Sequence, residues 1–567
     1  MSKRSFLLWP AFVVTMFILP GAFHASFARA GSLGHNLDDL YGSKVKMAAD
    51  GSPLLTVGLM ENKPVVRVTC KGRFRVESLL GNGLEMQAGT EVTVRIIKAR
   101  PAKIRTWVEV ASCDPSRIDF VKSTLQKWRK LGYSPRAYLK GGLIDIAGKT
   151  LDTRSFSIVL KGYDSRAGAM KAVEDLYRKK GVRASLFEEM LKLPGGRVRV
   201  SLSGSGSTLL EARDGVRFRP AAGDNPVVVK SVEYGRGYPW HGFEDRAFRG
   251  DIVVAIDSKA ALSVINEVSL EHWLKGTVPS EIFSRAAMDA LKAQACSARS
   301  EALAKLGTRH LADPFMLCAS QHCQVYGGVT KEKKRTSEAV DSTRGMVLLD
   351  STGRVLDAVY SAVSGGFTEN NDAAWPSPPN PNLRGRPDGP TGDRSWDPFR
   401  HGLNDSNLRE FLAHPPLTFE AKSSFLKADT FRWTKKLSSR ELDALVAKKL
   451  DVGHVEKLDV LERGVSGRIV LLRILGDKGS AVVQRELPIR RLFGGLKSAM
   501  FVIDQCAGSQ CTGPDRNGVF VFRGGGWGHG VGMSQIGAIG RAEAGQDFRQ
   551  ILDHYFSNAG LQRLYGK

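Results

Sequence analysis

A single carboxylic acid is the first candidate for chemistry. Glu281 ends the stretch "GTVPSE", just before a segment with a helical pattern. An acidic side chain at the start of a helix most often complements the helix dipole, so the residues alone favour a cap. Lys292 and Arg299 follow seven residues apart, about two helical turns, so one face would carry both cations and could grip an acidic ligand. The plainer alternative is surface pairing, for instance of Asp289 with Lys292.

A glycine run near the C-terminus is the second candidate. Six glycines fall within nine positions around Trp527 and His529. Glycine loses more backbone entropy on folding than any other residue, so such a run predicts positive φ or close backbone approach. Ser534 can cap a helix over 535–544, and Gly545 suits its C-terminal end. The free N–H groups at that helix start favour an anionic or polar ligand, with a plain turn as the alternative.

Histidine and cysteine gather in the stretch "HLADPFMLCASQHCQVYGG", which holds His310, Cys318, His322 and Cys323. Structural zinc sites combine such ligands at short spacings. A cysteine pair with four intervening residues equally suits a disulfide in an oxidising compartment. Zinc and a disulfide therefore both stay open for Cys318 and Cys323.

The other cysteines predict bridges and one inert thiol. A disulfide is expected between Cys506 and Cys511, and Cys70 with Cys113 is a candidate third pair. Cys296 lies in a helical pattern, where a buried inert thiol is commoner than a nucleophile.

The N-terminus and the charge indicate an exported protein. Residues 1–30 combine Lys3 and Arg4, a long apolar stretch and the small-x-small site "ARA", which predicts a secretory signal peptide. No later run of about 20 apolar residues suggests a membrane span. The formal charge of +24 favours envelope polyanions over nucleic acid in that compartment. GxxxxGK[ST] and a strict GxGxxG are absent from the glycine run, which sets nucleotide binding aside.

The periodicity predicts an α+β protein. Residues 54–111 alternate apolar and polar positions, which indicates a β-rich N-terminal domain. A strand, helix, strand, strand, helix, strand order over 105–188 predicts a ferredoxin-like fold, and with its basic helices resembles SPOR domains, which bind peptidoglycan strands stripped of stem peptides. Strands resume from 197, and a long helical segment with small apolar residues spans 288–302. A capping box at Ser438 predicts another helix start.

Five motifs in order over about 340 residues carry a family resemblance. They are "VPSEIFSRAAMDALKAQACSAR", "HCQVYGG", "TRGMVLL", "SGGFTEN" and "GGGWGHGVGMSQIGA". Together they resemble the SpoIID/LytB family, the stage II sporulation protein D group of cell-wall proteins. The resemblance implies lytic transglycosylation: cleavage of MurNAc–GlcNAc bonds in denuded glycan strands, leaving 1,6-anhydro-MurNAc ends. Many members carry a histidine where this chain has Ser361, so a role assigned to that histidine does not transfer.

The resemblance also implies site residues. Glu281 matches the family's essential glutamate, and Lys292 and Arg299 match its helix cations. One carboxylate suffices because the sugar's own 6-hydroxyl attacks, whereas ordinary glycosidases need two acids. Glu281 must then be protonated near neutral pH, so we expect both cations nearer the MurNAc lactyl carboxylate than Glu281. We further expect Ser364, Trp527, His529 and Gln535 to line the groove that binds the sugar. Some relatives bind zinc through one histidine and two cysteines, which match His310, Cys318 and Cys323.

The expected organisation is a signal peptide (1–30), a β-rich domain (31–103), a SPOR-like domain (104–192) and a mixed α+β SpoIID-type catalytic domain (193–567). A second hypothesis is a non-catalytic glycan-binding module that enhances an N-acetylmuramoyl-L-alanine amidase. A third is a metallohydrolase at the Cys/His cluster, whose activity chelation would abolish.

Overall fold

The computed structural model describes residues 37–566 except 43, 181, 183, 223–224, 236–240 and 507–517. The predicted signal peptide and Cys511 lie outside the described residues. Among the helices described, none has the length and apolarity to cross a membrane.

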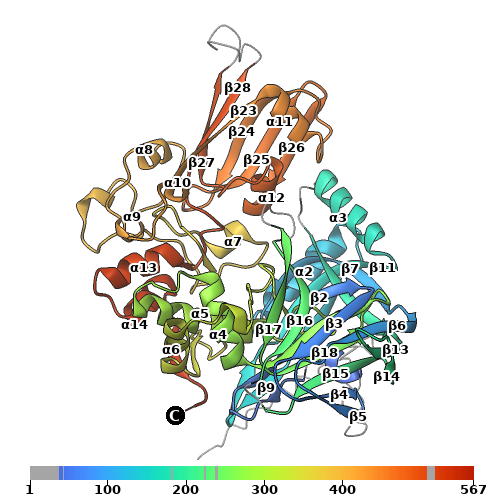
Figure 1. Cartoon of the computed structure of the whole chain (residues 1–567). Coiled ribbons are helices and arrows are strands. Elements are labelled where there is room, and N and C mark those ends of the chain that lie inside the picture. Colours follow the sequence, from blue (N-terminus) through green and yellow to red (C-terminus); the bar gives the residue numbers. More distant parts are fainter. Residues whose placement is uncertain are drawn as a thin grey trace, which may run out of the picture. The chain divides into compact units, whose positions relative to one another are not determined.

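Two large, mainly antiparallel sheets are built by the first β-rich region together with strands that follow the ferredoxin-like segment (Figure 1). The first sheet runs, in spatial order, β1 (Lys46–Met47), β2 (Pro53–Lys63), β19 (Leu262–Ser269), β18 (Asp251–Ile256), β15 (Gly215–Pro220), β4 (Phe74–Ser78) and β5 (Gly83–Met86), with β20 (Leu317–Cys318) parallel to β2. The second runs β14 (Thr208–Arg213), β13 (Gly195–Leu202), β6 (Val92–Arg100), β3 (Val65–Cys70), β16 (Val227–Tyr234) and β17 (Gly242–Phe248).

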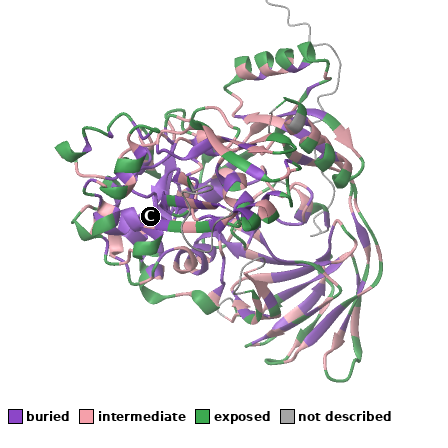
Figure 2. Cartoon of the chain, turned by 90° about the horizontal axis from the view of Figure 1, so that it is seen from above, coloured by how far each residue is buried: buried purple, intermediate pink, exposed green. Residues whose placement is uncertain are grey.

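Alternation of apolar and charged residues fixes which face of these strands is buried. In β13, Val198 and Val200 are fully buried while Arg197 and Arg199 are exposed. Successive side chains point to opposite faces of a strand, so this pattern gives one core face and one solvent face. Figure 2 shows buried and exposed positions interspersed along the strands.

The strand pairing differs from the expected separate N-terminal β domain. β6 pairs with β13, and β4 pairs with β15, so strands from either side of residues 103–192 share sheets. The cause is the hydrophobic patterning: single-faced antiparallel strands need partners, and the nearest partners here lie beyond the inserted segment.

The ferredoxin-like prediction is confirmed in its topology. The four-stranded sheet has the order β12–β7–β11–β8, which is fourth, first, third and second in the chain, and its pairs are antiparallel. Trp128 and Leu176 from its two helices pack on Val108 and Leu160 of the sheet. The elements are β7 (Lys103–Cys113), α2 (Ile118–Lys130), β8 (Arg136–Lys140), the hairpin β9 (Leu143–Ile146) and β10 (Lys149–Asp152), β11 (Ser155–Tyr163), α3 (Arg166–Lys180) and β12 (Ser185–Lys192).

Helices dominate the region that follows the large sheets. The central one is α5 (Met288–Lys305), which is buried on nearly every side and packs against its neighbours through small residues such as Ala295 and Ala298. The other elements of this region are α4 (Leu270–Glu281), α6 (Lys334–Ser342), α7 (Asn371–Ala374), α8 (Leu408–Ala413), α9 (Phe419–Lys422), α10 (Ala428–Phe431), α13 (Gln535–Glu543), α14 (Phe548–Tyr555), the 3-10 turns 329–331 and 394–396, and the short pairs β21 (Met346–Leu349) with β30 (Gly560–Arg563) and β22 (Tyr360–Ser361) with β29 (Met533–Ser534). The short helix α1 (Leu37–Tyr41) precedes the first sheet in the chain.

Two three-stranded sheets and two helices enclose a second core. Ser438 and Glu441 form the predicted capping box at the start of α11. The elements are β23 (Arg432–Ser438), β28 (Val519–Gly525) and β27 (Phe501–Cys506), then β24 (Val455–Arg463), β25 (Ile469–Gly476) and β26 (Gly479–Gln484), with α11 (Ser439–Val446) and α12 (Glu486–Leu492).

The candidate bridge between Cys70 and Cys113 is wrong. Both thiols are free and buried, because Cys70 ends β3 in one sheet and Cys113 ends β7 in another. Cys296 is the expected buried free thiol in α5.

Candidate functional site

Glu281 is the last residue of α4, whereas the sequence suggested a position at the entry of the next helix. Pro279 lies inside the final turn of α4, and α5 starts only at Met288. The side chain turns inward: its Oε1 accepts a hydrogen bond of 2.6 Å from the main-chain N–H of Val325. An acid at this end of a helix does not complement the dipole, so the capping interpretation fails.

The surroundings of Glu281 favour its neutral form. Burial raises the pKa of its carboxyl to about 7, the Val325 N–H opposes that rise, the charge of Glu301 adds to it and that of Lys305 opposes it. The negative end of the α4 dipole also disfavours a carboxylate at this position. A carboxylic acid with a pKa near neutrality can donate a proton and later accept one.

Gln535 joins the glycine-run segment to Glu281. It is the first residue of α13, and its Nε2 donates to the Glu281 carbonyl at 2.9 Å and to Oε1 of Gln294 at 3.3 Å. Ser534 caps this helix by accepting from the Gly537 N–H, as the sequence predicts. The cap and Gln535 therefore fix α13 against the chain segment that carries the acid.

Tyr360 and His529 form the next part of the cluster. The Tyr360 hydroxyl donates to Oε1 of Gln324 at 2.9 Å and lies in the electrostatic field of Glu281. The Val531 N–H donates to Nδ1 of His529 at 3.0 Å, and His529 also bonds the main chain of Tyr360. Burial lowers the pKa of His529 to about 3, so the imidazole is neutral and positions Tyr360 without serving as an acid.

The glycine run has the positive φ angles and the close backbone approach that the sequence predicts. Gly526, Gly528, Gly530 and Gly532 all have positive φ. At Gly530 a Cβ would lie 2.3 Å from the guanidinium carbon of the buried Arg468, so no other residue fits there. The run therefore provides close backbone approach at alternate positions.

Trp527 is the exposed aromatic residue of the glycine run. Its side chain is 41% exposed, and the Lys497 ammonium lies 5.7 Å from its ring centre. A large aromatic surface left in water can offer a stacking face to a sugar ring.

The two predicted cations of α5 lie in different surroundings. Arg299 is fully buried, and its guanidinium donates two 2.8 Å hydrogen bonds to Glu271 of α4. It also donates to main-chain carbonyls, so it has no free donor edge for a substrate, contrary to the expectation from the sequence. Lys292 follows the plainer alternative, with Asp289 at 4.0 Å and the Phe548 ring at 5.7 Å. Among the described residues, neither cation bonds Glu281.

Ser364 also differs from the expected groove wall. It is fully buried, and the N–H groups of Ser364, Gly365 and Gly366 all donate to the carboxylate of Glu420. Successive main-chain N–H groups that converge in this way form an anion-binding nest. The SGG motif thus holds an internal carboxylate, and the hydroxyl of Ser364 faces no open surface.

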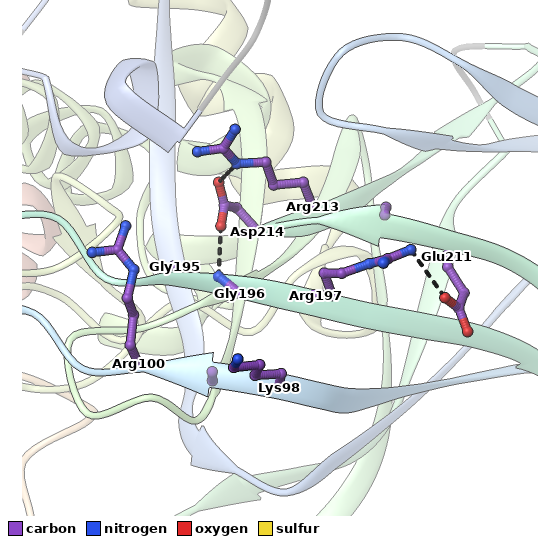
Figure 3. A pocket seen from close by; sticks show the side chains of 10 residues that line it. Lys98, Arg100, Gly195, Gly196, Arg197, Glu211, Arg213 and Asp214 are labelled. Carbon is purple, nitrogen blue, oxygen red and sulfur yellow. Dashed lines mark hydrogen bonds and ion pairs between the residues drawn. The ribbon is translucent and has the colours of Figure 1, made fainter.

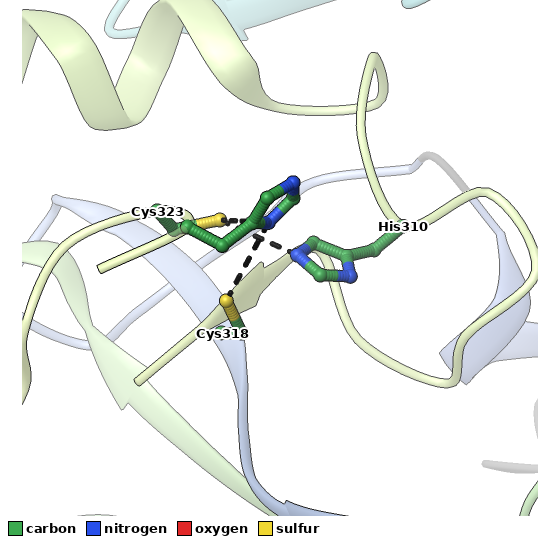
Figure 4. A group of neighbouring side chains, drawn as sticks. His310, Cys318 and Cys323 are labelled. Atoms are coloured by element: carbon green, nitrogen blue, oxygen red, sulfur yellow. Dashed lines mark hydrogen bonds between the residues drawn. The ribbon is translucent and has the colours of Figure 1, made fainter. Parts of the chain in front are cut away.

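The metal prediction gains a fourth residue. His310, Cys318, His322 and Cys323 place one ligand atom each within 4.8 Å of the others (Figure 4). Both cysteines are free thiols, so the disulfide alternative is not what the structure contains. The distance from His310 Nε2 to Cys323 Sγ is 3.3 Å, and His322 Nδ1 lies 3.8 Å from either sulfur.

This donor set fits zinc. Tetrahedral Zn²⁺ with ordinary Zn–N and Zn–S bonds keeps its ligand atoms about 3.3–3.8 Å apart. Nδ1 of His310 lies 2.9 Å from Oδ2 of Asp313, the outer carboxylate that commonly orients a zinc-bound imidazole. Four protein ligands would complete the tetrahedron and leave no position for a reacting water, which opposes the metallohydrolase hypothesis and favours a structural site.

Several residues of the cluster gave little signal in the sequence. Gln294 and Gln324 are buried amides that contact the Glu281 neighbourhood, and Val325 contributes only its main chain. A glutamine among small apolar residues in "LKAQACSAR" was the available clue for Gln294.

The geometry defines a class of site: one partly buried carboxylic acid of near-neutral pKa, anchored by main chain and amides and joined through Gln535 to the segment that carries an exposed tryptophan. Two segments of the chain match known protein families. Residues 258–349, which include Glu281, match the family described as Stage II sporulation protein (SpoIID), and residues 369–532 match a domain of unknown function, DUF8618. Over these residues, and in its similarity to two stage II sporulation D proteins, the chain resembles the SpoIID family.

Similar proteins agree with that placement. The chain is 27% identical over 303 residues to the amidase enhancer of Bacillus subtilis. The aligned region covers 51% of this chain and 40% of that protein. The chain is 24% identical over 317 residues to stage II sporulation protein D of Bacillus subtilis, and the aligned region covers 53% of this chain and 77% of that protein. An uncharacterised protein of Brachyspira hyodysenteriae is 26% identical over 300 residues, and the aligned region covers 53% of this chain and 68% of that protein.

Proposed function

We propose that the protein is an exported peptidoglycan lytic transglycosylase that acts on denuded glycan, with Glu281 as acid and then base. The observation that carries the proposal is the desolvated carboxyl of Glu281 with a pKa of about 7. In the first step, Glu281 gives its proton to the bridging oxygen as the bond from MurNAc C1 to that oxygen breaks. In the second, the 6-hydroxyl of the same MurNAc attacks C1 and its proton passes to Glu281, which restores the enzyme.

The neighbouring groups support this chemistry. The Val325 N–H holds one carboxyl oxygen at 2.6 Å, which leaves the other oxygen to carry the transferable proton. Trp527 offers the sugar a stacking face, and Lys292 is the partly exposed cation available to a lactyl carboxylate. Arg299 contributes by fixing α4 against α5 through Glu271.

The experiment compares wild type with Glu281→Gln on denuded glycan strands, with detection of 1,6-anhydro-MurNAc ends. Glu281→Gln retains shape but carries no transferable acid proton, so the yield should fall at least about a thousandfold. Glu338→Gln, an exposed change on α6, is the matched control and should keep full activity. Equal yields from Glu281→Gln and wild type would refute the proposal.

A second candidate is enhancement of an amidase, favoured by the 27% identity to the amidase enhancer. It predicts that an N-acetylmuramoyl-L-alanine amidase cleaves faster in the presence of the protein, and equally so with Glu281→Gln. Stimulation retained by Glu281→Gln, without anhydro ends from wild type, would replace the first proposal with this one.

A further inference from the structure

Three cations stand side by side on the solvent face of the second large sheet. Arg197 of β13 is directly opposite Arg213 of β14 on one side and Lys98 of β6 on the other. At the next exposed position, Arg199 is opposite the cation Arg95 on one side and Glu211 on the other. Directly opposed residues of an antiparallel pair have Cβ atoms about 5 Å apart, and like charges there destabilise the sheet. The repulsion between these facing cations therefore does not help to hold the sheet together.

The row borders a concave site of about 600 Å³ (Figure 3). Glycines form part of its floor: a Cβ at Gly195 would lie 3.2 Å from the Arg100 guanidinium, and one at Gly196 would lie 2.0 Å from the Lys98 carbonyl. A larger residue would crowd the Arg100 side chain at the first position and the main chain of β6 at the second. The lining residues are Lys98, Ala99, Arg100, Gly195, Gly196, Arg197, Glu211, Ala212, Arg213 and Asp214.

The site carries more positive than negative charge. Arg197 pairs with Glu211 and Arg213 with Asp214, each at 3.2 Å, but the two arginine side chains are 63% and 79% exposed. Exposed pairs of this kind contribute little and exchange readily. Lys98 and Arg100 have no acidic partner among the described residues. Four cations thus face two carboxylates in one groove.

We propose that this groove, which we call the cationic groove, binds a linear polymer that carries a phosphodiester in every repeat unit. Guanidinium forks match the two free oxygens of a phosphodiester, and cations on successive strands match charges that recur closely along a chain. No aromatic residue lines the groove, which disfavours stacked sugars or bases. A concave recess also suits a chain better than the flat surface of a bilayer. The site lies outside residues 258–349 and does not depend on the chemistry of Glu281.

The test measures binding of short synthetic poly(glycerol phosphate) to the full chain by fluorescence anisotropy at low salt. Wild type should bind, with affinity that falls as salt is added. The triple variant Lys98→Gln/Arg197→Gln/Arg213→Gln should bind at least about tenfold more weakly. Its melting temperature should stay equal or rise, because three facing like charges are removed. That second readout separates lost binding from lost folding.

The matched control is Arg440→Gln/Lys448→Gln/Lys449→Gln, which removes the same charge from exposed positions on and after α11. It should keep wild-type affinity. An equal loss in both triple variants would show a response to net charge alone and overturn the groove. Tighter binding of wild type to single-stranded DNA, to anionic lipid vesicles or to denuded glycan, lost in the groove variant, would overturn the assignment of the polymer. Because no turnover is measured, failure of this proposal leaves the transglycosylase proposal intact.

Discussion

The side-chain amide of Gln535 donates a 2.9 Å hydrogen bond to the main-chain carbonyl of Glu281, 254 residues earlier in the chain. This bond joins the segment that carries Trp527 and His529 to the segment that carries the acid. It also uses a carbonyl at the C-terminal end of α4, where helix carbonyls lack partners within the helix. Gln535 thereby sets the position of the acid without touching its carboxyl group.

Replacement of that amide should slow turnover. Gln535→Ala removes one hydrogen bond at the end of α4, worth about 1–1.5 kcal/mol, so kcat on denuded glycan should fall about tenfold with little change in KM. Gln562→Ala, on the exposed strand β30, is the control and should leave both constants unchanged. A raised KM with normal kcat would instead mean that Gln535 contacts the sugar.

Activity should decline as the pH rises through about 7. Glu281 acts first as an acid, and burial raises its pKa to about 7, so the reactive form is depleted above that pH. The pH profile of kcat/KM in wild type would locate this limb. A basic limb that appears only above pH 9 would contradict the assigned acid.

Stability should depend on pH through the same group. The folded protein holds the Glu281 proton more tightly than the unfolded chain, whose pKa is 4.5, so the stabilisation is complete below about 4.5 and is lost as pH rises through 7. The loss approaches about 3 kcal/mol at one pKa unit per 1.36 kcal/mol. Glu281→Gln stays neutral, so it should be more stable than wild type at pH 8 in chemical denaturation. Equal stability at pH 8 would argue that the carboxyl is solvated.

The sequence predicted local structure better than the assembly of the site. Hydrophobic periodicity indicated the ferredoxin-like elements, and Ser534 and Ser438 indicated two helix starts, because both signals act within a few residues. Glu281 was expected at the start of a helix, but it ends α4, whose last turn contains Pro279. The pairing of strands across residues 103–192 and the meeting of Gln535 with Glu281 depend on long-range packing, which periodicity does not encode.

The buried ion pair of Arg299 with Glu271 also depends on long-range packing. Glu271 lies 28 residues earlier in the chain than Arg299, and both side chains are almost fully buried. Arg299→Met leaves a buried unpaired carboxylate and should cost about 3–5 kcal/mol, whereas Arg299→Met/Glu271→Leu should recover most of that loss. Denaturant titration of both variants tests this. A stable Arg299→Met protein with a raised KM would restore the substrate-binding role expected from the sequence.

The Cys/His cluster should hold one metal ion. The four ligand atoms of His310, Cys318, His322 and Cys323 fit a closed tetrahedral site, so protein purified without reductant or chelator should contain about one zinc per chain and free thiols at both cysteines. Cys318→Ser should lower the zinc content and the melting temperature together, because metal binding adds to folding free energy. Cys113→Ser removes a buried free thiol that is not among the four ligands and should leave the zinc content unchanged. Zinc-free protein with Cys318 and Cys323 joined in a disulfide would refute the metal site.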